Sequence, residues 1–198
     1  KSGEKVENLV RLSFTLLFVV SVLLAAVSWF YRFEIMDLMY DHFISESASV
    51  FGVLMGCFIA ISTTYVFGTL LTANGNLKQL NLIAAGGMLL NISLNVLLIP
   101  RFGALGSAWT SLITQGIMAV AQIILVLIFF RFKFNPKFLG ALVVFVIGVV
   151  LINRVAVSLP LHWLQSLVLA IFLSVFLALV LRLLNLRYFI RLIASPAG

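Results

Sequence analysis

The chain has 198 residues, of which 63% are hydrophobic and only 10% are charged, and its mean hydropathy is +1.22. Soluble domains are about half apolar and about a quarter charged, so this composition excludes a soluble globular protein and indicates an integral membrane protein. The net charge is +7, but the basic residues lie at the ends of apolar segments. This placement favours contact with anionic lipid headgroups and argues against nucleic acid as a partner.

The start of the chain and its single cysteine limit the chemistry that we expect. Cys57 lies in an apolar run, so the sequence predicts no disulfide, no metal site and no cofactor. The apolar segment that follows Lys1 is too long for a signal peptide and lacks a small-x-small cleavage motif. We therefore expect the chain to be the C-terminal part of a longer protein.

The chain contains six stretches that are long enough to cross about 30 Å of hydrocarbon as helices, which takes about 20 residues each. The breaks between them have local causes: Asn74–Gly75 favours a turn, Pro100 with Gly103 ends one helix and starts the next, and Pro136 and Pro160 suit a first helical turn. The sequence predicts one all-α membrane domain with spans over residues 9–31, 48–71, 80–99, 105–130, 138–158 and 161–184.

The basic residues are distributed unequally between the two ends of these spans. If all six segments cross the membrane, ten of the 13 lysines and arginines share one side, and the other side holds three arginines together with acidic residues. Cytoplasmic loops carry the excess of Lys and Arg, so we expect both termini to be cytoplasmic. The ten residues are Lys1, Lys5, Arg11, Lys78, Arg131, Lys133, Lys137, Arg182, Arg187 and Arg191, and the three are Arg32, Arg101 and Arg154.

Two consecutive spans each carry a polar stripe at helical spacing. Amides that faced lipid would leave donors unsatisfied, so the stripes must face each other, other helices or water. Hydrogen bonding between helices is the more conservative interpretation, and a polar cavity is the alternative. The stripes consist of Asn81, Ala84, Met88, Asn91 and Asn95 in the third span, and of Ser107, Ser111, Thr114, Met118 and Gln122 in the fourth, with Thr110 and Gln115 beside them.

The acidic segment after the first span does not predict an enzyme. Glu34, Asp37, Asp41 and His42 could form an acid–base or metal site, but apolar residues alternate with them as in an interfacial amphipathic helix. The sequence shows no second ligand cluster and no nucleotide motif. We therefore expect no catalytic residues.

One stretch of the sequence resembles a known transporter family. YVFGTLLTANGNLKQLNLIAAGGMLLNISLNVLLIPRFGALGSAWTSLITQ, from Tyr65 to Gln115, is similar to the C-terminal half of bacterial polysaccharide-biosynthesis membrane proteins, and Glu34–Tyr40 resembles a further segment of them. These proteins are the lipid-linked oligosaccharide (O-antigen type) flippases of lipopolysaccharide synthesis, within the multidrug/oligosaccharidyl-lipid/polysaccharide exporter superfamily.

The resemblance implies a fold, a function and a substrate path. The chain would be one six-helix lobe of a two-lobed exporter in the bacterial inner membrane, working with an N-terminal lobe by alternating access. Its substrate would be an undecaprenyl-pyrophosphate-linked oligosaccharide, and Arg11 would contribute to binding the pyrophosphate. The path candidates are Arg11, Thr15, Thr64, Tyr65 and Thr69 on the first two spans, with Asn91, Asn95 and Gln115 as packing groups that touch the path.

Other functions remain open at this point. Another exporter of the same superfamily, for drugs or for lipid II, would have the same layout. An integral-membrane glycosyltransferase or polymerase would need loop carboxylates that are essential for sugar transfer. A non-transporting membrane scaffold would have a stable protein partner and no cavity.

Overall fold

The structure is a computed structural model that describes residues 2–132 and 135–184. These residues form helices and connecting turns, with no strand among them. The described part of the chain is thus all-helical, and its long apolar helices are those of an integral membrane protein. The helices are α1 (Ser2–Phe30), α2 (Arg32–Asp37), α3 (Ile44–Ala73), α4 (Leu77–Phe130), α5 (Pro136–Ser158) and α6 (Trp163–Val180).

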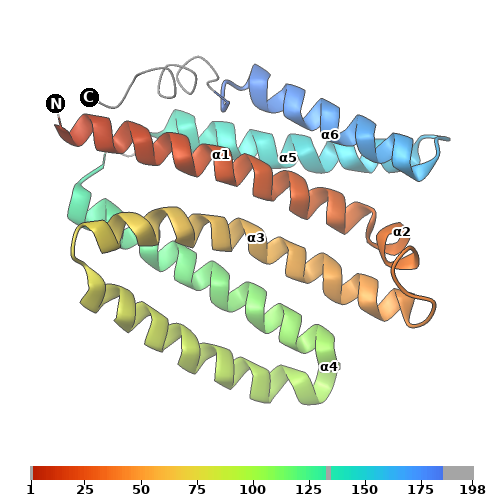
Figure 1. Ribbon diagram of the computed structural model, residues 1–198, viewed down its shortest axis with the longest axis horizontal. Helices are drawn as coiled ribbons and strands as arrows, with labels where there is room; N and C mark the ends of the chain where they lie inside the picture. The colour runs from red at the N-terminus through yellow and green to blue at the C-terminus, as the bar shows by residue number, and fades with distance from the viewer. Residues whose placement is uncertain (1, 133–134, 185–198) are drawn as a thin grey trace.

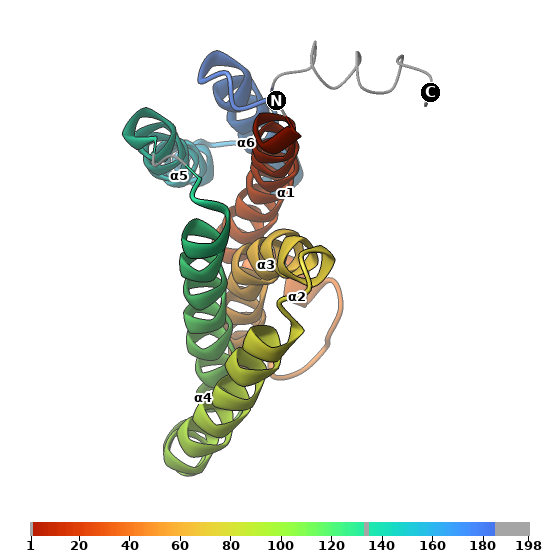
Figure 2. The ribbon, with the colours of Figure 1, turned by 90° about the vertical axis from the view of Figure 1, so that its left-hand side faces the viewer.

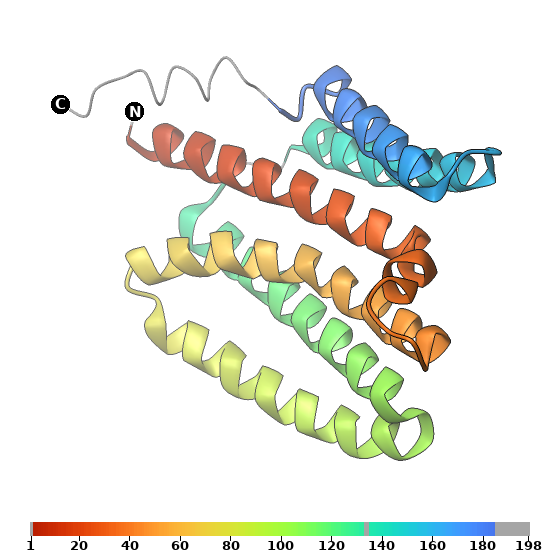
Figure 3. The same cartoon turned by 45° about the vertical axis from the view of Figure 1, so that its right-hand side comes forward.

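Helix α4 consists of two arms that fold back on each other (Figures 1 and 3). Its helical geometry is broken at Gly103, where φ is 57° and ψ is −134°, values that only glycine adopts readily. A Cβ atom on Gly106 would lie 2.5 Å from the carbonyl oxygen of Leu98, so the arms approach each other closely there. The sequence predicts that Pro100 ends the first arm, but the arm continues through Pro100 to the break at Gly103. Proline removes one backbone N–H from the last turn of this arm.

Five helices are long and apolar enough to cross a membrane: α1, α3, α4, α5 and α6. Because α4 is two helices merged across the break at Gly103, the described residues form six long apolar segments. These segments cover the six ranges that the sequence indicates, apart from residues at their ends. That each of the six crosses the bilayer, and that together they form one domain, stays a prediction.

Helix α1 is the element that joins the two parts of the bundle. On one side it packs against α3, which in turn packs against α4, and on the other side it contacts α5 and α6 (Figure 2). A buried apolar cluster holds the second group together; Phe145 and Val149 of α5 are fully buried in it. The other buried members are Val19 and Val22 of α1, Leu142 of α5, Ala178 of α6 and Leu183.

A buried hydrogen-bond chain fixes α1, α5 and α6 at one end of the bundle. Tyr31 is 1% exposed, and its hydroxyl lies 2.8 Å from the Ser166 hydroxyl. Ser166 donates to the Ala156 carbonyl, so the end of α1 is connected through α6 to the end of α5. Buried polar groups that are fully paired make such a contact specific.

The opposite end of the bundle holds most of the basic residues that the structure describes. There α1 begins, α3 ends, the first arm of α4 begins, its second arm ends, α5 begins and α6 ends (Figures 1 and 3). Lys78, Arg131, Lys137 and Arg182 lie at these helix ends. The cytoplasmic location of this end stays a prediction based on the charge count.

The approach of the two arms at Gly106 predicts a selective loss of stability. In Gly106→Ala the added methyl group meets the backbone of Leu98, and such overpacking costs about 1–3 kcal/mol. Gly86→Ala is the matched control, because nothing lies within 4 Å of a Cβ atom there. Thermal unfolding in detergent should show a lower Tm for Gly106→Ala and an unchanged or higher Tm for Gly86→Ala. Equal Tm values for both variants would contradict the close approach.

Candidate functional site

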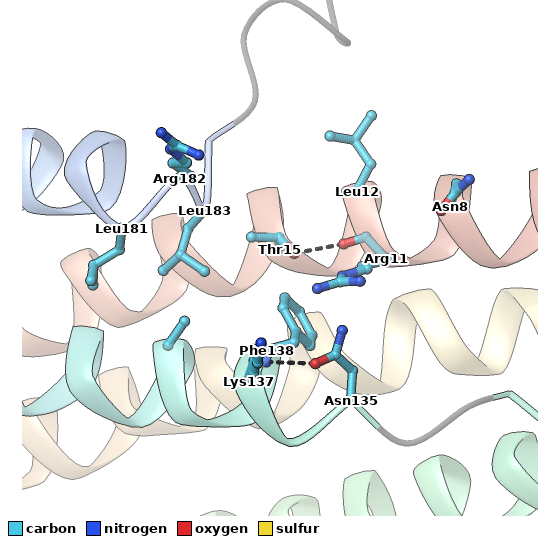
Figure 4. A pocket seen from close by; sticks show the side chains of 11 residues that line it. Asn8, Arg11, Leu12, Thr15, Asn135, Lys137, Phe138, Leu181, Arg182 and Leu183 are labelled. Carbon is cyan, nitrogen blue, oxygen red and sulfur yellow. Dashed lines mark hydrogen bonds between the residues drawn. The ribbon is translucent and has the colours of Figure 1, made fainter.

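A cavity of about 480 Å³ with both polar and apolar lining residues lies where α1, the start of α5 and the end of α6 meet. It is at the basic end of the bundle, and Figure 4 shows its lining side chains. Three of them are cations, one from each helix or its end: Arg11, Lys137 and Arg182. The remaining lining residues are Asn8, Leu12, Thr15, Asn135, Phe138, Ala141, Leu181 and Leu183.

Helix α1 contributes one face to the cavity. Asn8, Arg11, Leu12 and Thr15 are spaced by three and four residues, which places them on the same side of a helix. Thr15 is buried, and its hydroxyl donates to the Arg11 carbonyl at 2.6 Å. The Arg11 side chain is exposed, and its guanidinium carbon lies 4.2 Å from the centre of the Phe138 ring. The cation is therefore held by an aromatic ring and left open to an anion.

The start of α5 is fixed by an N-cap that positions Lys137. The Asn135 side-chain oxygen accepts from the Phe138 N–H at 3.1 Å, and Pro136 follows the cap at the first helical position. Both residues are favoured at these positions. The sequence Asn-Pro-Lys-Phe thereby places Lys137 on the cavity wall and Phe138 under Arg11.

The end of α6 has the hydrogen bonds of a Schellman motif, and this motif positions Arg182. The Leu183 N–H bonds to the Ala178 carbonyl and the Arg182 N–H to the Leu179 carbonyl, both at 3.0 Å. Arg182 occupies the left-handed position with a φ of 54°, where glycine is usual. The motif turns Leu183 into the apolar cluster and leaves the Arg182 side chain exposed at the cavity.

The electrostatics of this cavity favour an anion. No acidic residue is among its lining residues, while Asn8, Asn135 and Thr15 supply further polar groups. Arginine and lysine form charge-assisted hydrogen bonds with phosphate and carboxylate groups. Because all three cations are solvent-exposed, water and salt weaken each single contact, and binding depends on their joint action.

The path candidates from the sequence fall into separate places. Arg11 and Thr15 line the cavity. On α3, Thr64 and Thr69 bond to carbonyls of their own helix, and Tyr65 is 70% exposed. None of these three lines the cavity. Of the five path candidates on the first two spans, Arg11 and Thr15 thus lie together at the cavity. A substrate path along α3 stays a prediction.

The polar stripes of α4 bond within each arm. Asn95 donates to Asn91 at 2.9 Å, and Thr110 donates to the Gly106 carbonyl at 3.0 Å. Gln115 is half-buried on the second arm. These side-chain hydrogen bonds of the stripes thus stay within one arm, because a hydroxyl or amide in a helix reaches the preceding turn most easily. Gln122 is buried and lies beside Gly68 of α3, so it packs across that interface.

Sequence reasoning missed four polar residues of the cavity: Asn8, Asn135, Lys137 and Arg182. The charge count had placed Arg11, Lys137 and Arg182 on the same side of the membrane, which was the available signal. The charge count could not show that the start of α5 and the end of α6 both lie near residues 8–15 of α1.

One comparison with known proteins found a match, and it is to a family of membrane transporters. Residues 1–97 match the MatE family, which supports the multidrug/oligosaccharidyl-lipid/polysaccharide exporter superfamily as the class of this chain. The curated proteins gave no match, and neither did the solved structures. The matched part contains α1, α2, α3 and most of the first arm of α4.

The left-handed backbone of Arg182 predicts an unusual effect of its removal. Arg182→Gly relieves a conformation that costs a non-glycine residue about 1–2 kcal/mol, so the variant should keep or raise the Tm of the protein while it loses the charge. Arg182→Ala also lacks the charge but retains a Cβ atom, and its Tm should stay below that of the glycine variant. Thermal unfolding in detergent measures both. A lower Tm for Arg182→Gly than for Arg182→Ala would contradict the role of the motif.

Proposed function

We propose that this chain is the C-terminal lobe of a flippase that moves an undecaprenyl-pyrophosphate-linked oligosaccharide across the bacterial inner membrane. The observation that carries the proposal is the cavity in which Arg11, Lys137 and Arg182 meet. A diphosphate bears several negative charges and offers many acceptor oxygens, which suits convergent cations. The MatE match of residues 1–97 supports an exporter, and the cationic cavity favours an anionic cargo for it.

The proposed mechanism is alternating access between this lobe and an N-terminal lobe. In it, the cations at the basic end of the bundle bind the diphosphate from the cytoplasmic side, and the saccharide follows a polar path past Thr64, Tyr65 and Thr69. Asn91, Asn95 and Gln115 act in packing within the lobe. Arg11 lies on α1, which contacts both parts of the bundle.

A drug exporter is the second candidate, and cargo charge distinguishes the two. A cationic drug would be repelled by the cavity, whereas an anionic lipid would be attracted. Drug resistance conferred by the full-length protein, without any effect on the outer-leaflet pool of lipid-linked saccharide, would favour the drug exporter.

Removal of the three cations should abolish flipping. In cells that depend on the full-length protein, the variant Arg11→Gln/Lys137→Gln/Arg182→Gly should fail to deliver lipid-linked saccharide to the outer leaflet, as measured by labelling of periplasmic sugar. Each single substitution should lower the rate by about tenfold or less, because a hydrogen bond to a charged group contributes about 1.5–3 kcal/mol before screening by water.

Two matched controls separate this effect from a general loss of charge. Lys78→Gln removes a cation at the same end of the bundle but outside the cavity lining, and Arg101→Gln removes one beside the break in α4. Both should flip at the wild-type rate. Normal flipping by the triple variant, at normal protein abundance, would refute the proposed role of the cavity.

A further inference from the structure

Of the three cations at the cavity, Arg11 is the one that lies over an aromatic ring in the described part of the chain. Its guanidinium carbon is 4.2 Å from the centre of the Phe138 ring, and Figure 4 shows the Arg11 side chain extending from α1 toward that ring. The face of an aromatic ring is electron-rich and attracts a cation. An exposed arginine, which would otherwise sample many rotamers, is thereby held at one place on the cavity wall.

Phe138 is itself fixed by the fold. Its backbone N–H donates to the Asn135 side-chain oxygen at 3.1 Å, and its ring packs against the buried apolar cluster. The ring of Phe14 meets it edge to face, with the two ring centres 6.5 Å apart. The Phe138 ring can therefore act as a fixed support for the exposed Arg11 side chain.

The chemistry of arginine explains what such a support does for anion binding. The N–H groups of a guanidinium lie in its plane and form a fork that fits two oxygens of a phosphate group. When a ring face holds the cation, N–H groups at the rim of the guanidinium stay available to the anion. The loss of rotamer freedom that the anion would otherwise impose has already occurred, so less free energy opposes binding.

We propose that Phe138 is a positioning residue of the cationic cavity, which orients the Arg11 guanidinium as a fork for a phosphate group. This inference rests on the proposed function, because it takes a diphosphate as the ligand. It assigns a role in anion binding to a side chain that carries no charge and acts only through Arg11.

Glu7 is the alternative partner for Arg11. It lies one turn earlier on α1, which places both side chains on the same side of the helix. A carboxylate bound to Arg11 would occupy the N–H groups that the anion needs, whereas a ring does not. Glu7→Gln should therefore leave anion binding unchanged or make it tighter. Weaker binding by this variant would overturn the proposal in favour of Glu7.

Binding of inorganic pyrophosphate to the purified full-length protein in detergent tests the proposal. Calorimetric titration at low ionic strength is suitable, because salt screens exposed charges. Phe138→Leu should weaken binding by about two- to tenfold, since the anion then has to order the Arg11 side chain. Phe138→Tyr keeps an aromatic ring and should stay within about twofold of the wild type.

Two comparisons separate the electrostatic role of the ring from its role in packing. Pentafluorophenylalanine at position 138 fills nearly the same space, but fluorine reverses the charge distribution of the ring face, so this variant should bind as weakly as Phe138→Leu. In the background of Arg11→Gln, Phe138→Leu should cause no further loss, because its effect depends on the guanidinium. Wild-type binding by the pentafluoro variant, or an equal loss in the Arg11→Gln background, would overturn the proposal.

A second arginine–aromatic contact provides the matched control. The Arg32 guanidinium carbon lies 4.7 Å from the centre of the Phe33 ring, beyond the end of α1 that is remote from the cavity. Phe33→Leu removes the same kind of contact there and should leave pyrophosphate binding unchanged. A loss equal to that of Phe138→Leu would contradict a local role of Phe138.

This experiment and the flipping assay can fail independently. If the triple cation variant flips normally while Phe138 and Arg11 are coupled in pyrophosphate binding, the proposed function fails and the positioning role stands. If the triple variant does not flip while the two residues contribute independently, the function stands and the positioning role fails. A wild-type protein that does not bind pyrophosphate would also overturn the positioning role.

Discussion

The cost of placing a charge in hydrocarbon, about 2.5–3.5 kcal/mol for Arg, Lys or Asp at the centre of a helix, organises this structure. It confines the charged side chains to the helix ends, where they reach headgroups or water. Because several helices begin or end at the same end of the bundle, that end holds most of the positive charges that the structure describes. The cationic cavity forms where the first part of α1, the start of α5 and the end of α6 meet. The same energetic cost that keeps charged side chains out of the hydrocarbon thus brings three of them together.

The sequence was sufficient for the parts of the fold that depend on local chemistry. Apolar length located the helices, and Gly103 located the reversal inside α4 that lets its 54 residues pack as two arms. Pro136 located the first turn of α5, whereas its N-cap, Asn135, was not predicted. Pro100 shows the limit of such local rules: proline removes one backbone N–H, yet the helix continues through it to the break at Gly103.

The candidate site could be predicted only in part, because it depends on which helix ends are neighbours. Arg11 and Thr15 share a helix face, so spacing alone places them together. Lys137 and Arg182 are distant from them in sequence, and their approach depends on the buried cluster around Phe145 and on the link from Tyr31 to Ser166. These packing contacts act between helices, and hydrophobic periodicity does not encode them when most of every helix surface is apolar.

Arg182 shows how the site and the fold compete for one position. A Schellman motif normally takes glycine at its left-handed residue, and glycine there would be less strained than the arginine with its φ of 54°. Strain of this kind persists where the surrounding structure fixes the backbone, and it is frequent at functional sites. The Ala178–Leu183 bond and the buried Leu183 side chain provide that fixation. The glycine that would best end α6 would lack the cation that completes the cavity, so the arginine at this position favours a role for its charge.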